Sequence, residues 1–419
     1  MKKNKKHIHI IGGGLYGCLL AHQLLKKNYK VIIFEKSNKL ISSFDSIKLG
    51  NLKLNNGFHG LDLPRAKNLF SFFKNNLKIK FDIFEIKRKI LFERNLIDYK
   101  AKRNEWPKKI QSYLKDGAKY YKNQKLNFFF KSNIINLFKK NSLRYFESFE
   151  KAKSFFLPWF LPADVKHFST DEGDNFRSLV RQNKIKGYVA LPRKHLFSII
   201  KKKFYNYLVS RGVTIYFNTE IKILNNKVRY FEKNKEIFFD KSNIKKIFYC
   251  LSPAFLIRDI SFGHFKKLNN YKKFAINCVI KISDENFKNN FNEILSLNNK
   301  ISFVHRIYSL NYYKFIKDKK NSFLVLEILS SKNYLNTQNK KNLINEIKLI
   351  FNLKRKPSFV DYIVTRQIYS VEEKWIAKSK KILNSKITKK LNLKYINNFY
   401  PLNMSKAWIN ALTSSKHVL

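Results

Sequence analysis

The chain has 419 residues, 44% of them apolar, and a formal net charge of +56. This length exceeds one small core and the apolar content is enough for real cores, so we expect two domains rather than a disordered chain. Lysine is spread evenly along the sequence, together with much asparagine, isoleucine and phenylalanine. Because a nucleic-acid binder more often concentrates charge on one element, we expect no specific nucleic-acid partner, only weak, salt-sensitive adhesion to anionic membrane surfaces.

Cysteine usage and the absence of long apolar runs limit the cellular context. The three cysteines, Cys18, Cys250 and Cys278, form no Cys-x-x-Cys pair. They predict neither a disulfide framework nor a metal site, which favours a reducing, cytoplasmic location. The basic start Met1–Lys6 leads into a glycine-containing apolar run, so it does not predict a secretion signal. No run of about 18 apolar residues predicts a membrane-spanning helix.

A glycine-rich turn follows the first apolar run, His7–Ile11. Gly12 allows a tight turn, Gly14 removes a side chain where a pyrophosphate would approach the backbone, and Gly17 lets a helix lie close to the strand. The start of that helix would offer free N–H groups and a partial positive charge to phosphates. The spacing predicts a strand, a phosphate-binding turn and a helix.

A second apolar run, Val31–Phe34, ends in Glu35, about 20 residues after the first glycine. This acid would accept hydrogen bonds from a ribose diol and repel a 2′-phosphate. Between the two runs, Asn28 can end a helix in a left-handed conformation. The predicted apolar stripe of the helix consists of Leu15, Cys18, Leu19, Leu24 and Leu25.

Residues 76–187 lack this pattern and are predicted to form an inserted domain. Strand-like runs cover Phe81–Phe84 and Lys89–Phe92, and aromatic-rich stretches at Trp106–Tyr121 and Leu143–Phe156 are typical of helices. From Gly187 to Pro192 we expect a turn that leads into an amphipathic helix over 194–210, ended by Arg211 and Gly212.

The rest of the chain alternates strands and helices. Strands are predicted at Val213–Phe217, Glu220–Leu224, 228–239 (two-stranded), Ile247–Leu251 and Phe323–Leu329. Helices are predicted over Lys340–Phe351 and from Pro401 onward, the second capped by Asn403 or Ser405.

The order of these predicted elements along the chain resembles that of flavoproteins of the amine-oxidase and protoporphyrinogen-oxidase superfamily. Within it, UDP-galactopyranose mutase-like proteins are the most similar in pattern. The unit from Gly12 to Glu35 matches their FAD-binding start. Further matching segments are Asn56–Gly60, Tyr188–Leu208, Thr214–Ile221, His305–Ile307 and Pro401–Trp408. Where these families carry Gly-Gly pairs, this chain has Ile41–Ser43 and Arg193–Lys194, and Tyr395–Phe399 replaces a glycine pair before the last helix.

The resemblance implies an α/β fold in which a Rossmann-like FAD-binding domain is interleaved with a mixed α+β substrate domain. The FAD-binding domain would comprise 1–75, 188–258 and 378–419, and the substrate domain 76–187 and 259–377. The implied cofactor is FAD, held by Gly12, Gly14, Leu15, Tyr16, Gly17, Glu35, Lys36, Gly57, His59, Ile221, Asn403 and Met404. The resemblance also implies two catalytic residues, His59 nearest the flavin and Arg306 in the substrate half.

Three functions remain open at the level of sequence. One is an FAD-dependent oxidoreductase acting on a small molecule, with a nucleotide sugar of cell-surface polysaccharide synthesis as one candidate. Another is a mutase on a nucleotide sugar without net redox change. The third is a flavoprotein-fold remnant that has lost catalysis.

Overall fold

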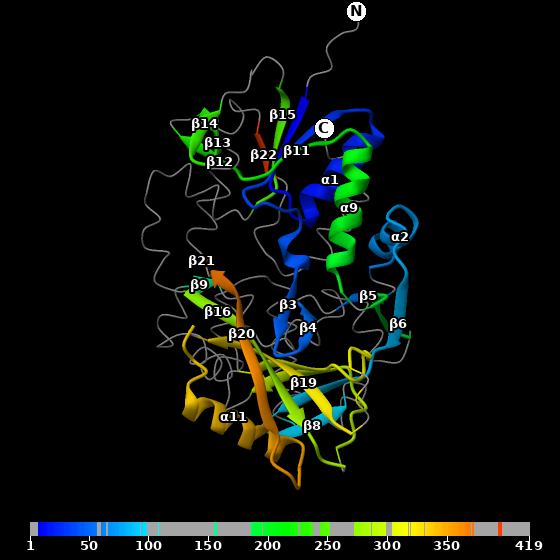
Figure 1. Ribbon diagram of the computed structural model, residues 1–419, viewed down its shortest axis with the longest axis vertical. Coiled ribbons are helices and arrows are strands. Elements are labelled where there is room, and N and C mark those ends of the chain that lie inside the picture. The colour runs from blue at the N-terminus through cyan, green and yellow to red at the C-terminus, as the bar shows by residue number, and fades with distance from the viewer. Residues whose placement is uncertain are drawn as a thin grey trace, which may run out of the picture.

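The computed structural model shows two β-sheet regions, one above the other, with helices packed on them (Figure 1). The described residues are 7–56, 60–63, 66–92, 94–98, 108, 155–156, 186–194, 196–224, 227–237, 244–251, 272–285, 287–298, 304–316, 318, 320–330, 332–369, 371–372 and 393–395.

A five-stranded sheet contains the first strand of the chain. Its order is β11-β2-β1-β15-β22, and every neighbouring pair is parallel. The strands are β1 (His7–Ile11), β2 (Lys30–Phe34), β11 (Thr214–Tyr216), β15 (Ile244–Tyr249) and β22 (Leu393–Tyr395). Parallel strands covered on both faces need nearly continuous apolar runs, which this sequence has in β1 and β2. This order is the doubly wound, Rossmann-like arrangement, so the predicted fold class is confirmed.

Two helices lie together on this sheet, α1 (Leu15–Lys26) and α9 (Ser198–Ser210) (Figure 1). Both contribute fully buried side chains to one core, Leu19 from α1 and Phe204 from α9 among them. Asn28 adopts the predicted left-handed conformation after α1, with a φ of 58°. A third helix, α2 (Lys67–Asn75), adds Leu69, Phe72 and Phe73 to the same core.

A seven-stranded sheet forms the second region, in the order β20-β16-β19-β18-β17-β7-β8. Only the β7–β17 pair is parallel. The strands are β7 (Arg88–Phe92), β8 (Asn95–Asp98), β16 (Lys272–Ile282), β17 (Glu293–Asn298), β18 (Val304–Ser309), β19 (Ser322–Ser330) and β20 (Ser358–Tyr369). Helix α11 (Thr337–Ile350) packs its buried side chains into a core with one face of this sheet.

The other face of this sheet, which we call the inner face, carries Val279, Tyr308 and Val325. Their sequence neighbours pack with α11, and successive side chains of a strand point to opposite faces. A hairpin of β3 (Ser46–Leu49) and β4 (Leu52–Asn55) packs on the inner face through its buried leucines. The hairpin therefore joins the five-stranded part of the molecule to the large sheet (Figure 1).

Three smaller sheets complete the described fold. One orders β5 (Leu61–Leu63), β10 (Tyr188–Pro192) and β6 (Phe81–Glu85), and another orders β12 (Thr219–Leu224), β13 (Lys227–Glu232) and β14 (Lys235–Ile237). The third pairs β21 (Val371–Glu372) with β9 (Phe155–Phe156). The β5-β10-β6 sheet spans the predicted boundary at residues 75 and 76, and the division into two domains stays a prediction.

Two local predictions were wrong. The expected turn from Gly187 to Pro192 is strand β10, because β5 and β6 supply pairing partners on both sides that are distant in sequence. The helix after it begins at Ser198 rather than at residue 194, since Lys194 is left-handed.

Part of another prediction was also wrong, because Phe155–Phe156, expected at the end of a helix, is strand β9. Otherwise the helices predicted over Trp106–Tyr121, Leu143–Phe156 and from Pro401 lie outside the described residues, apart from the helical Lys108.

Candidate functional site

The turn between β1 and α1 needs glycine at two positions for steric reasons. Gly12 has a φ of 103°, and its N–H donates to the carbonyl of Phe34 at 2.9 Å. A Cβ on Gly17 would lie 2.1 Å from the carbonyl oxygen of Gly12, which no side chain can avoid. A Cβ on Gly12 would meet Leu251 at 2.5 Å. Because neither residue has a Cβ, the start of the helix can lie directly against the carboxyl end of β1.

Gly14 is different, because its missing side chain faces open space. It is the N-cap of α1, its backbone is extended, and a Cβ built on it has no atom within 4 Å. No side chain caps the helix and no acid lies in its first turn. The positive end of the helix dipole therefore faces an accessible space, which is the arrangement that binds phosphate groups.

The two residues that follow Gly14 differ in how far their side chains are buried. Leu15 is buried, with 3% of its surface exposed, so its side chain belongs to the core rather than to the site. Tyr16 is half-buried and packs at the edge of the same core. Both lie in the first turn of α1, beside the space in front of Gly14.

Glu35 follows β2 and lies beside this loop. One of its carboxylate oxygens accepts a hydrogen bond from the Gly13 N–H at 2.7 Å, and the other accepts from the N–H and hydroxyl of Ser37. Its main chain is fixed as well, because its N–H donates to Tyr216 and its carbonyl accepts from Thr219. An acid held at this place can accept ribose hydroxyls and would repel a 2′-phosphate.

Lys36 and Ile221 lie near Glu35 because the Thr219 N–H donates to the Glu35 carbonyl, which brings the start of β12 to the end of β2. Lys36 pairs with Glu220 at 2.8 Å, which connects the end of β2 to the start of β12. Burial raises the pKa of Glu220, but Lys36 and Lys222 together bring it below its ordinary value. Ile221 has only 6% of its surface exposed and packs in the core with Phe34. The structure thus brings the predicted residues from Gly12 to Lys36 together with Ile221.

One replaced Gly-Gly pair lies directly against the glycine loop. The Ile41 N–H donates to the Gly13 carbonyl at 2.9 Å, and Ile41 has a φ of 47°. A β-branched residue in this left-handed region is strained. The other replacement, Lys194, is left-handed too, with a φ of 69°. At both places a residue other than glycine adopts a backbone conformation that suits glycine.

Arg306 lies away from the glycine loop, on the inner face of the large sheet. Its Nε is 3.0 Å from Glu293 and 4.0 Å from Glu327, both of which are buried. Glu293 also pairs with Arg88 at 2.5 Å, and Arg88 pairs with Asp62 at 3.1 Å. We call these five side chains the inner-face cluster.

The inner-face cluster contains three carboxylates and two guanidinium groups, so its formal charge is −1. Burial alone would lower the pKa of Arg306, but Glu293 and then Glu327 raise it above its ordinary value. Arg306 is therefore charged, and the carboxylates beside it offset that charge. A substrate phosphate would have to compete with Glu293 for this guanidinium.

Of the cluster, only Arg306 was predicted from the sequence. Glu327 could have been noticed, because it is an acid within the apolar run Phe323–Leu329. Nothing in the sequence indicates the other three: Arg88 and Glu293 are brought together by the pairing of β7 with β17, and Asp62 comes from β5 in another sheet. The predicted residues Gly57, His59, Asn403 and Met404 lie outside the described residues.

The described residues also limit other kinds of site. No helix among them is long and apolar enough to cross a membrane. Within the same part of the chain, no group of three or more His, Cys, Asp or Glu side chains could hold a metal ion. The three cysteines are free thiols, and Cys18 and Cys278 are buried.

The parallel sheet, the glycine loop and the acid after β2 together define a dinucleotide-binding fold of the Rossmann-like class. The comparisons with known proteins agree. Residues 10–75 match the family model described as an NAD(P)-binding Rossmann-like domain. A comparison of the sequence with curated proteins found no match.

Solved structures similar in fold cover nearly the whole chain. A reduced UDP-galactopyranose mutase aligns with a TM-score of 0.63 at 12% identity, over 97% of this chain and 92% of its own. Putrescine oxidase aligns with a TM-score of 0.58 at 10% identity, over 97% of both chains. A protein named as a protoporphyrinogen oxidase, from Exiguobacterium sp. 255-15, aligns with a TM-score of 0.59 at 8% identity, over 97% of both chains. These likenesses confirm the predicted fold, which the chain shares with these solved structures along nearly its whole length.

Proposed function

We propose that this protein is an FAD-dependent oxidoreductase of the amine-oxidase and protoporphyrinogen-oxidase type that acts on a small-molecule substrate in the cytoplasm. The observation that carries the proposal is the space in front of Gly14. The loop packs tightly at Gly12 and Gly17 and leaves room only where a pyrophosphate would bind. The shared fold with putrescine oxidase and UDP-galactopyranose mutase supports the choice of FAD.

The residues present fit a flavin dinucleotide. The N-terminus of α1 would hold the pyrophosphate, Glu35 the ribose next to the adenine, and the segment with Lys36 and Ile221 the adenine end. The carboxylate of Glu35 favours FAD or NAD over NADP, because a 2′-phosphate would meet a negative charge. When bound, FAD would supply the redox chemistry, and the protein would supply binding, orientation and electrostatics.

In this proposal the domains divide the work as the sequence analysis predicted, with the inner face of the large sheet turned to the substrate. Gly57, His59, Asn403 and Met404 are proposed at the flavin, on the resemblance alone. His59 would lie nearest the reacting part of the cofactor, and Arg306 would contact the substrate.

The mutase is the second candidate, and the shared fold with UDP-galactopyranose mutase favours it. Its substrate, a nucleotide sugar, carries a diphosphate and needs a net positive site. The inner-face cluster has a formal charge of −1 instead, and Arg306 is held by Glu293. This electrostatic balance is the reason that we place the oxidoreductase first and the nucleotide sugar second.

The proposal is tested on the purified protein from flavin-replete expression. We expect a flavin absorption spectrum, and chromatography of the ligand released by denaturation should give FAD. Release of NADP, or of no nucleotide, would contradict the proposal and, in the second case, favour a non-catalytic remnant.

A titration with UDP, followed by flavin fluorescence, separates the two enzyme classes. No binding favours the oxidoreductase, whereas tight binding that Arg306→Lys weakens favours the mutase, because lysine cannot reproduce a bidentate contact with phosphate.

A further inference from the structure

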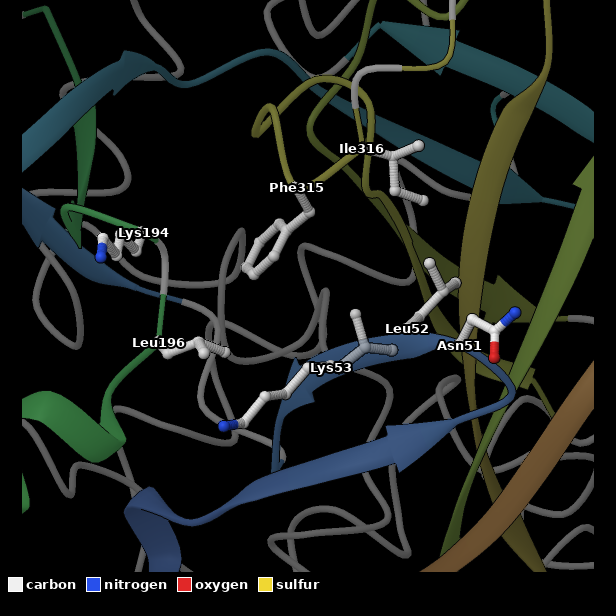
Figure 2. A pocket seen from close by; sticks show the side chains of 8 residues that line it. Asn51, Leu52, Lys53, Lys194, Leu196, Phe315 and Ile316 are labelled. Atoms are coloured by element: carbon white, nitrogen blue, oxygen red, sulfur yellow. The ribbon is translucent and has the colours of Figure 1, made fainter.

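A cavity of about 250 Å³ lies where β4, the turn before α9 and the segment between β18 and β19 meet. Figure 2 shows Leu196 and Phe315 pointing toward each other across this space, while Lys53 and Lys194 end on the Leu196 side. The lining residues are Asn51, Leu52, Lys53, Leu54, Lys194, Leu196, Phe315 and Ile316. The lining combines apolar side chains with Asn51 and two lysines, and the two lysines are its only charged groups.

Neither lysine has an anionic partner among the described residues. Asp45, just before β3, is already shared by Lys39 and Lys201, and Asp82 pairs with Arg193. Lysine without a partner is common in a chain of this charge, so it does not by itself indicate a site. What distinguishes Lys53 and Lys194 is that both line the same cavity, together with the apolar side chains of Leu196 and Phe315.

The walls of the cavity are fixed by contacts between distant parts of the chain. Asn55, at the end of β4, accepts a hydrogen bond from the buried N–H of Phe197 at 2.9 Å. The N–H of Arg193 donates to the carbonyl of Lys80 at 2.8 Å. These bonds place the turn with Lys194 against the strand with Lys53 before any ligand arrives. A preformed site loses less conformational entropy on binding than one that has to be ordered.

The volume limits the size of a ligand. At roughly 25 to 30 Å³ for each non-hydrogen atom, the cavity holds about eight to ten such atoms. An acyl chain of a membrane lipid is too long for it, and an inorganic anion would leave the apolar wall uncovered. A short apolar group with one anionic head matches both the walls and the two cations.

We propose that this cavity binds a small amphipathic anion, with a carboxylate or phosphate head at Lys53 and Lys194 and an apolar tail against Leu196 and Phe315. None of its residues belongs to the glycine loop or to the inner-face cluster. A ligand there would contact β4 and the turn before α9.

Isothermal titration of the full chain with octanoate tests the proposal in about 200 mM salt, which screens non-specific attraction to the basic surface. We expect saturable binding of one equivalent. Pentyl phosphate, which like octanoate has about ten non-hydrogen atoms and so fits the same volume, forms a second arm, and the tighter of the two ligands identifies the head group. Octanol and octylammonium, which have the same tail without an anion, should bind at least tenfold more weakly. Acetate, which has the head without the tail, should not compete.

Two variants connect binding to these residues. Lys53→Gln and Lys194→Gln should each weaken octanoate binding on the order of tenfold, because each loses a charge-assisted hydrogen bond. Lys341→Gln, an exposed lysine on α11, is the matched control and should bind octanoate as the wild type does. A thermal melt confirms that each variant is folded. Equal octanoate binding by all four proteins, or equal binding of octanol and octanoate, would overturn the proposal.

Discussion

The glycine loop and the inner-face cluster differ in how far apart their residues lie in the chain. The loop is complete within Gly12–Glu35, and its hydrogen bonds come largely from the main chain. The cluster joins residues such as Arg88 and Glu293, which are 205 positions apart, through their side chains. A local motif can be recognised from spacing, whereas a cluster of this kind exists only once the sheet register is set.

The electrostatics of the two regions differ as well. The start of α1 presents a partial positive charge to open space and has no side chain to satisfy it. The inner-face cluster consists of full charges that are buried and paired with one another. The start of α1 can therefore bind an anion from solution, whereas the charges of the inner-face cluster largely neutralise one another.

The largest expected effect separates two glycines of the same loop. Gly17→Ala should destabilise the fold by about 4 kcal/mol or more, because its Cβ would lie 2.1 Å from the Gly12 carbonyl oxygen. Gly14→Val should leave the free energy of unfolding within about 1 kcal/mol of wild type, since its side chain meets no protein atom. It should nevertheless abolish dinucleotide binding.

Urea unfolding and the flavin content of the purified protein measure these two effects. If Gly14→Val kept its nucleotide at wild-type stoichiometry, the space in front of Gly14 would not be the phosphate site. If Gly17→Ala were as stable as wild type, the close contact between α1 and the loop would be incorrect.

The next effect concerns the cluster. Glu293→Gln should destabilise the protein by about 4 kcal/mol, because it leaves Arg88 and Arg306 without their shared buried carboxylate. Glu220→Gln is the matched control, since Glu220 pairs with Lys36 at the surface. That change should cost less than about 1 kcal/mol. Equal losses in urea unfolding would show that the cluster is solvated rather than buried.

These expectations show what the sequence could and could not predict. The Rossmann-like fold was predictable because β1, α1 and β2 follow one another and each has its own local signal. The position of Glu35 was predictable for the same reason. Strand β10 was missed because its pairing partners, β5 and β6, lie more than a hundred residues away. The residues around Arg306 were missed because no spacing in the sequence connects Asp62 with Glu327.

The left-handed turns show a further limit. The sequence shows residues other than glycine at Ile41 and Lys194, but not the backbone conformation there. The structure shows a left-handed backbone at both positions, in which a residue with a side chain is strained. Hydrogen bonds from neighbouring segments fix these turns, so the residue type alone does not determine them.

A smaller effect depends on pH and arises in the five-stranded part. Burial lowers the pKa of His9 and of His22 to about 4. Both are neutral in the folded protein, whereas in the unfolded chain they take up protons below about pH 6.5. Stability is therefore complete above pH 6.5 and falls as the pH drops toward 4, by about 2 kcal/mol per histidine between pH 7.5 and 5.

The free energy of unfolding at these two pH values measures this loss. The double variant His9→Phe with His22→Phe should lose about 4 kcal/mol less than the wild type over this range. His9 accepts or donates one hydrogen bond with Tyr230, so the variant will also be less stable at pH 7.5. An unchanged difference between pH 7.5 and pH 5 would mean that neither histidine is neutral in the fold.

The smallest effect compares the two left-handed turns at Ile41 and Lys194. Lys194→Gly should raise the free energy of unfolding by about 1 kcal/mol, because Lys194 is exposed and glycine adopts its φ of 69° without strain. Ile41→Gly should instead lower it by about 2 kcal/mol. Ile41 has 1% of its surface exposed, so the loss of core packing exceeds the relief of strain. Urea unfolding of both variants decides the matter, with Lys194→Ala as the control that removes the side chain but keeps the strained backbone. A Lys194→Gly protein no more stable than Lys194→Ala would mean that the turn before α9 carries no strain.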